Sequence, residues 1–152
     1  MMLASRYGNI NVYLEPGEAV VLNAGVFVTT VLDLVKNGVD IAVLDSSAET
    51  HMPDVLAMPY TPKIIGSRPP GELPYTYRLG GISCLAGDFI GTYSFEKPLR
   101  IGQRLVLLDM ALYSFVKNTT FNGIELPSII LFDGENIVFE KKFSYKDYVS
   151  RL

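Results

Sequence analysis

The chain has little of what marks several classes of protein. It contains one cysteine, one histidine and no tryptophan among 152 residues, so it cannot form an intrachain disulfide and does not require an oxidising compartment. Its formal net charge of −3 argues against nucleic acid or an anionic membrane as the main partner. No apolar run is long enough to span a bilayer, and no basic segment precedes a hydrophobic one at the N-terminus. These absences predict a cytoplasmic protein.

Hydrophobic residues make up 49% of the chain and charged residues only 19%, which excludes a disordered protein and allows a folded core. With so much apolar surface and no membrane segment, we expect part of it to be buried against another surface, such as a second chain. The sequence has no Walker loop, no dinucleotide-binding glycine motif and no paired cysteines. We therefore expect no bound metal.

The first 38 residues read as one β/α unit. Met1–Asn11 resembles the tail of a helix (Met2–Tyr7) and a turn, Val12–Leu14 a short strand, and Glu15–Glu18 a tight turn. Asn23 is a suitable N-cap for a helix running to Lys36, which Asn37-Gly38 would end. The apolar face of that helix would hold Val26, Phe27, Thr30, Val31, Leu34 and Val35.

From residue 39 onward the pattern is mainly β. Strands are expected at Val39–Leu44, Tyr75–Leu79, Phe89–Phe95, Arg104–Leu108, Ser128–Phe132 and Ile137–Lys142. Asp133–Asn136 predicts a hairpin between the last two, and Ser144 can cap a final helix over Tyr145–Leu152. A polar turn over Glu49–Asp54, with one helical turn through Ala57, follows the first of these strands. Short strands separated by Gly/Pro turns predict a β-barrel or sandwich.

Two runs have more chemical character than their surroundings. Gly80–Asp88 places the single cysteine, Cys84, between paired glycines and a Gly-Asp pair, so the thiol is held on a turn that a ligand can approach. Asp109–Gly123 combines the hydroxyl of Tyr113 with a polar Asn-Thr-Thr and an aromatic residue. A lone cysteine is also commonly a small buried apolar side chain, so the residues alone leave both interpretations open.

Several motifs in register resemble the C-terminal part of the fold type III pyridoxal-phosphate decarboxylases, which include the ornithine, arginine and diaminopimelate enzymes. In this sequence they are Glu15-Pro16-Gly17, Val20–Gly25, Asp45, Cys84-x-x-Gly87-Asp88, Asp109-x-x-x-Tyr113 and Phe121-Asn122. The residues at Glu15–Ala19, His51–Asp54, Cys84–Asp88 and Val116–Gly123 are most similar to the carboxynorspermidine (carboxyspermidine) decarboxylase branch. The resemblance covers essentially the whole chain.

The resemblance implies a fold and an assembly. Residues 1–38 would be the last strand and helix of an alanine-racemase-like (β/α)8 barrel, and residues 39–152 a Greek-key-type C-terminal β-domain. Relatives form homodimers in which this β-domain completes an active site with the barrel of the other subunit. Most of the barrel, with the lysine that binds pyridoxal 5'-phosphate, has no counterpart in this sequence. We expect the chain to be a fragment or one half of a split enzyme, inactive on its own.

The resemblance also implies roles for individual residues. Glu15 would keep the pyridine nitrogen of the cofactor protonated, although a glutamate here also simply opens a turn. The backbone of Gly17 and the hydroxyl of Tyr113 would contact the phosphate, although Tyr113 also suits a core position. Cys84, supplied by the partner subunit, would reprotonate the α-carbon after carbon dioxide leaves. Asp88 would order the loop of Cys84.

Two departures from the better-known enzymes predict the substrate class. Glu18 replaces an arginine and Leu85 replaces an acid of the ornithine and diaminopimelate enzymes. Carboxylates at Glu18 and Asp54 would bind the ammonium groups of a polycationic amino acid. His51 would orient Asp54 or contact the ligand, and a structural role is the alternative.

Two other functions stay open at this point. The chemistry could be the same with a smaller diamino acid as substrate, but Leu85 argues against this because it removes an expected substrate-binding acid. The chain could instead be a non-catalytic regulatory or assembly module that uses the dimer surface of the β-domain. The absence of most of the barrel favours the module, and the presence of Glu15, Cys84 and Tyr113 argues against it.

Overall fold

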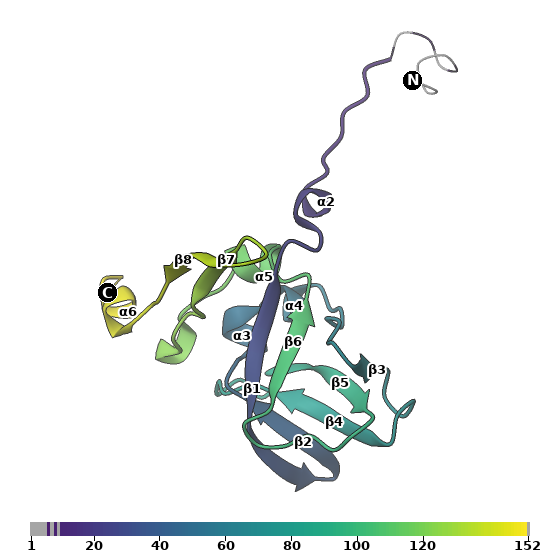
Figure 1. The fold of residues 1–152 in the computed structure, drawn as a ribbon, viewed down its shortest axis with the longest axis vertical. Helices are drawn as coiled ribbons and strands as arrows, with labels where there is room; N and C mark the ends of the chain where they lie inside the picture. The colour runs from purple at the N-terminus through teal and green to yellow at the C-terminus, as the bar shows by residue number, and fades with distance from the viewer. Residues whose placement is uncertain (1–5, 7, 9, 152) are drawn as a thin grey trace.

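The computed structural model describes residues 6, 8 and 10–151. It is mainly β, with one curled six-stranded sheet, a separate hairpin and an N-terminal arm that runs away from the sheet (Figure 1). The helix tail expected over Met2–Tyr7 falls almost wholly outside the described residues. None of the helices within the described ranges is long and apolar enough to cross a membrane.

The main sheet has the strand order β3-β5-β4-β2-β1-β6. Its strands are β1 (Val26–Asn37), β2 (Val39–Leu44), β3 (Ser67–Arg68), β4 (Tyr75–Gly80), β5 (Phe89–Phe95) and β6 (Arg104–Leu108). The hairpin consists of β7 (Ile129–Phe132) and β8 (Ile137–Lys141). The helical segments are short: α2 (Glu18–Val21), α3 (Ala48–His51), α4 (Asp54–Ala57), α5 (Tyr113–Val116), the 3-10 turn η1 (Phe121–Gly123) and α6 (Tyr145–Val149).

The helix predicted from Asn23 to Lys36 is wrong, because this segment forms strand β1. Valine and threonine dominate its first half, and β-branched side chains fit a pleated strand better than a helix. Asn37-Gly38, read as a helix stop, is the reversal of a hairpin: Asn37 pairs with Val39, and Gly38 has a φ of 70°. Asn23 does not cap a helix, and its backbone adopts a φ of 60°.

Two further expectations near the N-terminus need correction. Val12–Leu14 is not a strand but part of the exposed arm. The turn expected at Glu15–Glu18 ends in the one-turn helix α2, which Gly17 precedes with a φ of 28°. Strand β1 pairs with both β2 and β6 in the main sheet, so the helix that had suggested a boundary at residue 38 is absent. The division into a barrel remnant and a β-domain stays a prediction.

The β pattern after residue 38 is confirmed. Strands β2, β5 and β6 span the predicted residues, and β4, β7 and β8 differ from them by one residue at one end. The hairpin at Asp133–Asn136 forms, and Ser144 makes a capping box with Asp147 at the start of α6. The mainly β class with a curled sheet is therefore confirmed, whereas the Greek-key barrel topology stays a prediction.

Residues 63–68 connect the two outer strands of the curled sheet. Leu108 donates its N–H to Lys63 (2.8 Å), and Ile65 donates to Val106 (3.0 Å) on β6. A few residues later β3 pairs with β5 at the other edge. These contacts cover part of each edge of the sheet. Inside the curl lie the largest fully buried apolar side chains: Val31, Leu44, Met52, Leu79, Ile90 and Leu107.

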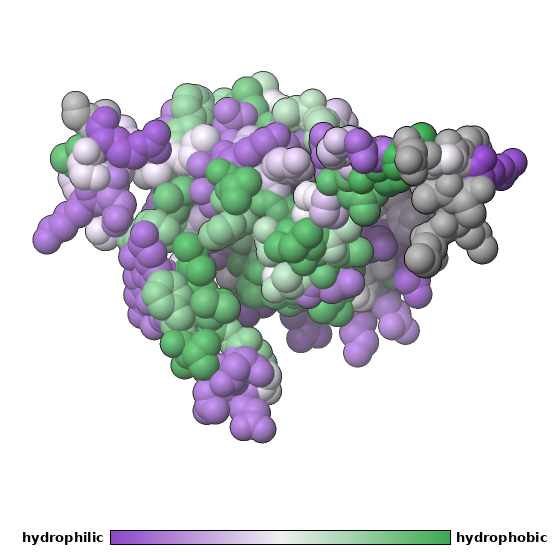
Figure 2. All heavy atoms as spheres, turned by 90° about the horizontal axis from the view of Figure 1, so that it is seen from above, coloured by the Kyte–Doolittle hydropathy of each residue, from purple (hydrophilic) through white to green (hydrophobic). Residues whose placement is uncertain are grey.

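Apolar side chains remain exposed at one end of the molecule. They belong to the hairpin (Ile130, Leu131, Phe132, Ile137, Val138 and Phe139), the start of β1 (Val26 and Val28) and the arm (Val12, Tyr13 and Leu14). Viewed from above, apolar residues gather over much of the surface (Figure 2). The expectation from composition that apolar surface needs a partner is consistent with this exposure.

Val31 and Val35 of β1 lie on either side of the register shift between Val31 and Asp33, and they differ in burial. Val31 is fully buried and Val35 is 42% exposed, whereas both would have faced the core of a helical segment. We expect Val31→Ala to lower the free energy of unfolding by about 2 kcal/mol, through lost burial and a cavity. Val35→Ala should change it by less than about 0.7 kcal/mol. Urea unfolding of the two variants measures the difference, and equal losses would contradict the observed orientation of β1.

Candidate functional site

The loop that carries Cys84 is fastened at both ends. Gly81 donates its N–H to the carbonyl of Asp88 (2.8 Å), and Ile82 donates to the carbonyl of Ser46 (3.1 Å). Between these ties the Cys84 side chain is exposed to solvent. The thiol is therefore not the buried apolar side chain that was the alternative interpretation, and it lies on a surface where another molecule can meet it.

The carboxylate of Asp88 joins this loop to helix α3. It is buried, with 4% of the residue exposed. One oxygen accepts N–H groups from Ala48 (2.6 Å) and Glu49 (3.2 Å), and the other accepts from Ser83 (2.9 Å). Three donors satisfy a charge that would otherwise be costly to bury. The prediction that Asp88 orders the loop is confirmed.

Helix α3 also holds the second distinctive run. The N–H of Thr119 donates to the carbonyl of Thr50 (2.8 Å), and the ring of His51 reaches the carbonyl of Glu125 through Nε2 (2.9 Å). His51 Nδ1 accepts the N–H of Ser47 (3.2 Å), so the donor to Glu125 is Nε2–H. Burial lowers the pKa of His51, which keeps the ring neutral.

Both ring nitrogens of His51 are thus occupied by backbone groups. The residue is 6% exposed, and its hydrogen bonds go to Ser47 and Glu125 rather than to Asp54. This geometry fits the structural alternative for His51, which holds the segment around Glu125 against α3. Neither ring nitrogen is left free to bind a ligand.

The two runs meet at Cys84. The side-chain Nδ2 of Asn122 donates a hydrogen bond to the Cys84 Sγ at 3.0 Å. Asn122 lies in η1 with a φ of 59°, a left-handed conformation that asparagine tolerates better than most residues. The sequence marked both runs as unusual but did not pair these two residues. The Asn122-Gly123 pair, favourable for left-handed backbone, was the available signal.

A second polar cluster contains Asp54 and Tyr60. The Tyr60 hydroxyl donates to Asp54 Oδ2 (2.8 Å), while Oδ1 is buried and has no hydrogen-bond partner within the described ranges. Burial, and next the bond to Asp54, raise the pKa of Tyr60; Glu18 raises it further. Glu18, which lies in α2, is the smallest of these influences on the pKa of Tyr60.

Tyr60 was missed by the sequence analysis. It stands between Pro59 and Pro62, and a segment stiffened by two prolines presents a side chain in a fixed position. That spacing was the available signal. The Tyr60 hydroxyl is thus a partner of Asp54, and its oxygen still has lone pairs to offer.

The residues expected at the cofactor are exposed. Tyr113 starts α5 and is 48% exposed, with the ammonium of Lys117 lying 4.6 Å from the centroid of its ring. Glu15 and Gly17 lie on the arm, and in the described part of the chain no hydrogen bond joins them to Cys84 or Tyr113. The base of the arm is tied near α5, since Asn23 donates to Asp109 (2.8 Å) and Met110 donates to Gly25 (3.0 Å).

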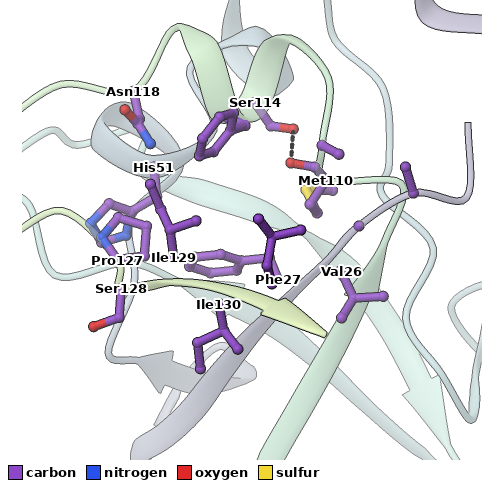
Figure 3. A pocket seen from close by; sticks show the side chains of 15 residues that line it. Val26, Phe27, His51, Met110, Ser114, Asn118, Pro127, Ser128, Ile129 and Ile130 are labelled. Carbon is purple, nitrogen blue, oxygen red and sulfur yellow. Dashed lines mark hydrogen bonds between the residues drawn. The ribbon is translucent and has the colours of Figure 1, made fainter. Parts of the chain in front are cut away.

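A cavity of about 240 Å³ lies beside these groups, between the start of β1, helix α5 and strand β7. Most of its lining is apolar, including Phe27, Met110, Ile129 and Ile130, with His51 and Ser114 among the polar residues (Figure 3). The Ser114 hydroxyl donates a hydrogen bond to the carbonyl of Met110 (3.4 Å). Neither Cys84 nor Asp54 lines the cavity, so it is separate from the two polar clusters.

Comparison with known proteins shows the family of this chain. The sequence profile of the pyridoxal-dependent decarboxylase C-terminal sheet domain matches residues 9–111, which is more than half of the chain. The chain belongs to the pyridoxal-dependent decarboxylases. Over 97% of its length this chain is 45% identical to a carboxynorspermidine/carboxyspermidine decarboxylase of Campylobacter jejuni, and it covers 42% of that protein.

Two further relatives show similar likeness. A carboxyaminopropylagmatine decarboxylase of Synechocystis is 44% identical to this chain over 97% of its length, and this chain covers 38% of that relative. The crystal structure of a Campylobacter jejuni carboxynorspermidine decarboxylase with norspermidine superposes on 99% of this chain and 44% of that one, with a TM-score of 0.86 and 43% identity. The chain spans less than half the length of these relatives.

Glycines in the Cys84 loop test the role of Asp88. A Cβ at Gly81 would overlap the Asp88 carboxylate, whereas one at Gly87 would meet nothing within 4 Å. Gly81→Ala should lower the free energy of unfolding by about 1–3 kcal/mol, because it disturbs the packing or the three N–H bonds of Asp88. The matched control Gly87→Ala should stay within about 0.7 kcal/mol. Thermal unfolding gives both values, and an unaffected Gly81→Ala protein would contradict the contact.

The buried His51 predicts how stability depends on pH. Its pKa in the folded chain lies below the ordinary value of 6.5, so the unfolded chain binds more protons between the two values. The contribution of neutral His51 to the free energy of unfolding is complete above about pH 6.5. It is lost as the pH falls through the pKa of His51 in the folded chain. The urea concentration at the midpoint of unfolding should therefore fall when the pH is lowered from about 7.5 to about 5.5. His51→Gln, which removes the only histidine, should flatten the profile, and an unchanged slope in that variant would contradict the assignment.

Proposed function

We propose that the complete protein is a pyridoxal-phosphate-dependent decarboxylase that converts carboxynorspermidine or carboxyspermidine to norspermidine or spermidine. The observation that carries the proposal is the exposed Cys84 thiol, fastened by Asp88 and in contact with Asn122. It lies in a chain whose near relatives are named as decarboxylases of carboxylated polyamines. A solvent-facing thiol held by two loops suits a proton donor.

The cofactor supplies an electron sink for the charge left when carbon dioxide departs. The residues expected to hold it are suited to that role, because Glu15 and Tyr113 are exposed side chains and Gly17 offers backbone without a side chain. Lys117, whose ammonium lies over the Tyr113 ring, adds positive charge beside the hydroxyl that would contact the phosphate. We propose that Glu15 keeps the pyridine nitrogen protonated.

Cys84 would then deliver a proton to the α-carbon of the substrate. In relatives of this architecture the cysteine serves the active site of the other subunit, so we propose a homodimer in the cytoplasm. The loop that carries Cys84 in one protomer would face the residues that hold the cofactor in its partner. This division accounts for a thiol that lies on the surface of the chain, away from the arm with Glu15.

Asp54, Tyr60 and Glu18 are proposed to bind the distal ammonium groups of the substrate. Asp54 is 5% exposed and holds the Tyr60 hydroxyl, so it acts through Tyr60, whose oxygen can accept an ammonium N–H. Glu18 is exposed and supplies the direct charge. His51 contributes by holding the frame of the site. Leu85, which replaces an acid of the ornithine-type enzymes, suits a long substrate that is held at its far end.

The exposed apolar hairpin and arm are proposed to be covered in the complete enzyme by the barrel expected from the relatives, of whose length this chain spans less than half. Without the cofactor lysine, the isolated chain should not turn over substrate.

Carboxyaminopropylagmatine is a second candidate substrate. The Synechocystis relative named for it is almost as similar to this chain as the Campylobacter enzyme. Both names describe a carboxylated chain with distal cationic groups, which suits Glu18 and Tyr60 alike. A smaller diamino acid also carries a distal ammonium group, but it fits less well because Leu85 stands where the ornithine-type enzymes have a substrate-binding acid.

Charge-neutral variants of the complete enzyme test the proposal. Glu18→Gln and Asp54→Asn should each lower kcat/KM for carboxynorspermidine by about tenfold, since each removes one ion pair or its support. Glu72→Gln, on an exposed turn, is the matched control and should leave kcat/KM unchanged. Steady-state kinetics with carboxynorspermidine, carboxyaminopropylagmatine and diaminopimelate identify the substrate. Preference for diaminopimelate, or unchanged kinetics in both variants, would refute the assignment.

A further inference from the structure

We propose that Asn122 is a positioning residue for Cys84: its side-chain N–H holds the sulfur and stabilises the thiolate that remains after proton transfer. The inference rests on the proposed role of Cys84 and adds a residue to it. Asn122 is 38 positions away in sequence, and its Nδ2 lies 3.0 Å from Cys84 Sγ. A hydrogen-bond donor directed at sulfur favours the charged form of the side chain.

The backbone of Asn122 is arranged to make this contact. Its φ of 59° lies in the left-handed region, which costs most non-glycine residues free energy unless the surroundings hold them there. The turn is closed by hydrogen bonds from Gly123 to Thr120 (2.9 Å) and from Ile124 to Phe121 (3.2 Å). This conformation turns the amide toward the Cys84 loop.

Helix α3 keeps the two loops in register. Its first N–H groups bind Asp88, which fastens the Cys84 loop. Its carbonyl at Thr50 receives Thr119, and its His51 side chain binds Glu125, so both flanks of Asn122 are attached to the same helix. The distance between Nδ2 and Sγ is thereby set by short hydrogen-bonded links on each side.

The chemical step defines what the amide contributes. The S–H bond of Cys84 breaks, the electron pair at the α-carbon of the decarboxylated substrate takes the proton, and sulfur keeps the S–H pair as a thiolate. Solvent later returns a proton to sulfur. Asp88, the carboxylate of the same loop, is turned to Ala48, Glu49 and Ser83, so it does not supply this stabilisation. The Asn122 N–H is the group in contact with the developing charge.

Alkylation of Cys84 by iodoacetamide tests the contact directly, because it is the single cysteine of the chain and the thiolate is the reacting form. Asn122→Asp keeps the shape but places an oxygen against the sulfur. Asn122→Gly keeps the left-handed φ and removes the donor. Both should slow alkylation at neutral pH, Asn122→Asp by about tenfold, because the thiolate loses its hydrogen-bond donor.

Asn118→Asp is the control, since it adds the same charge to the same segment with no hydrogen bond to Cys84; its alkylation rate should match that of the parent chain. An unchanged rate in Asn122→Asp, or an equal loss of rate in Asn118→Asp, would overturn the proposal. In the complete enzyme, Asn122→Gly should lower kcat with KM unchanged. Cys84→Ala tests the proposed proton donor separately from the contact with Asn122. Full decarboxylation by that variant would refute the role of Cys84. Alkylation of the variants that keep Cys84 would still decide whether Asn122 contacts the sulfur.

Discussion

The hydrogen bonds between the buried Asp88 carboxylate and three backbone N–H groups are the constraint on which the site depends. Helix α3 has four residues, far too few to be stable as an isolated helix. It exists because Asp88 and the Ser47 hydroxyl satisfy its first N–H groups and because its buried residues, such as Ala48, pack in the core. The segment around Asn122, which α3 holds through Thr50 and His51, therefore depends on the contact that Asp88 of the Cys84 loop makes with α3.

Much of the fold after residue 38 was predictable, since strands such as β2, β5 and β6 are apolar runs bounded by Gly, Pro and Asp turns. Strand β1 was mistaken for a helix for a physical reason. Residues four apart share a face in both a helix and a strand, and Asn-Gly ends helices as readily as it turns hairpins. Only the pairing with β2 and β6, which is set by tertiary contacts, distinguishes the two.

The site was predictable in its parts but not in its contacts. The composition of the two runs singled out Cys84 and the segment around Asn122, yet a pair 38 residues apart is brought together only by α3, which neither run contains. His51 looked like a ligand residue because a lone histidine in a polar turn has no visible partner in the sequence. Its partners are backbone groups of Ser47 and Glu125, and no side-chain pattern encodes those.

The exposed apolar hairpin bears on why the chemistry is divided. Most residues of β7 and all residues of β8 are exposed, although a two-stranded hairpin is at best marginally stable alone. Partner surfaces on both sides would stabilise it, and the same assembly would bring the Cys84 loop to a cofactor held elsewhere. In the proposed enzyme the proton donor and the electron sink meet only when those surfaces are covered. Assembly would then exclude water from the site at the same time as it completes the catalytic groups, so these residues on their own would carry a correctly held thiol with nothing to protonate.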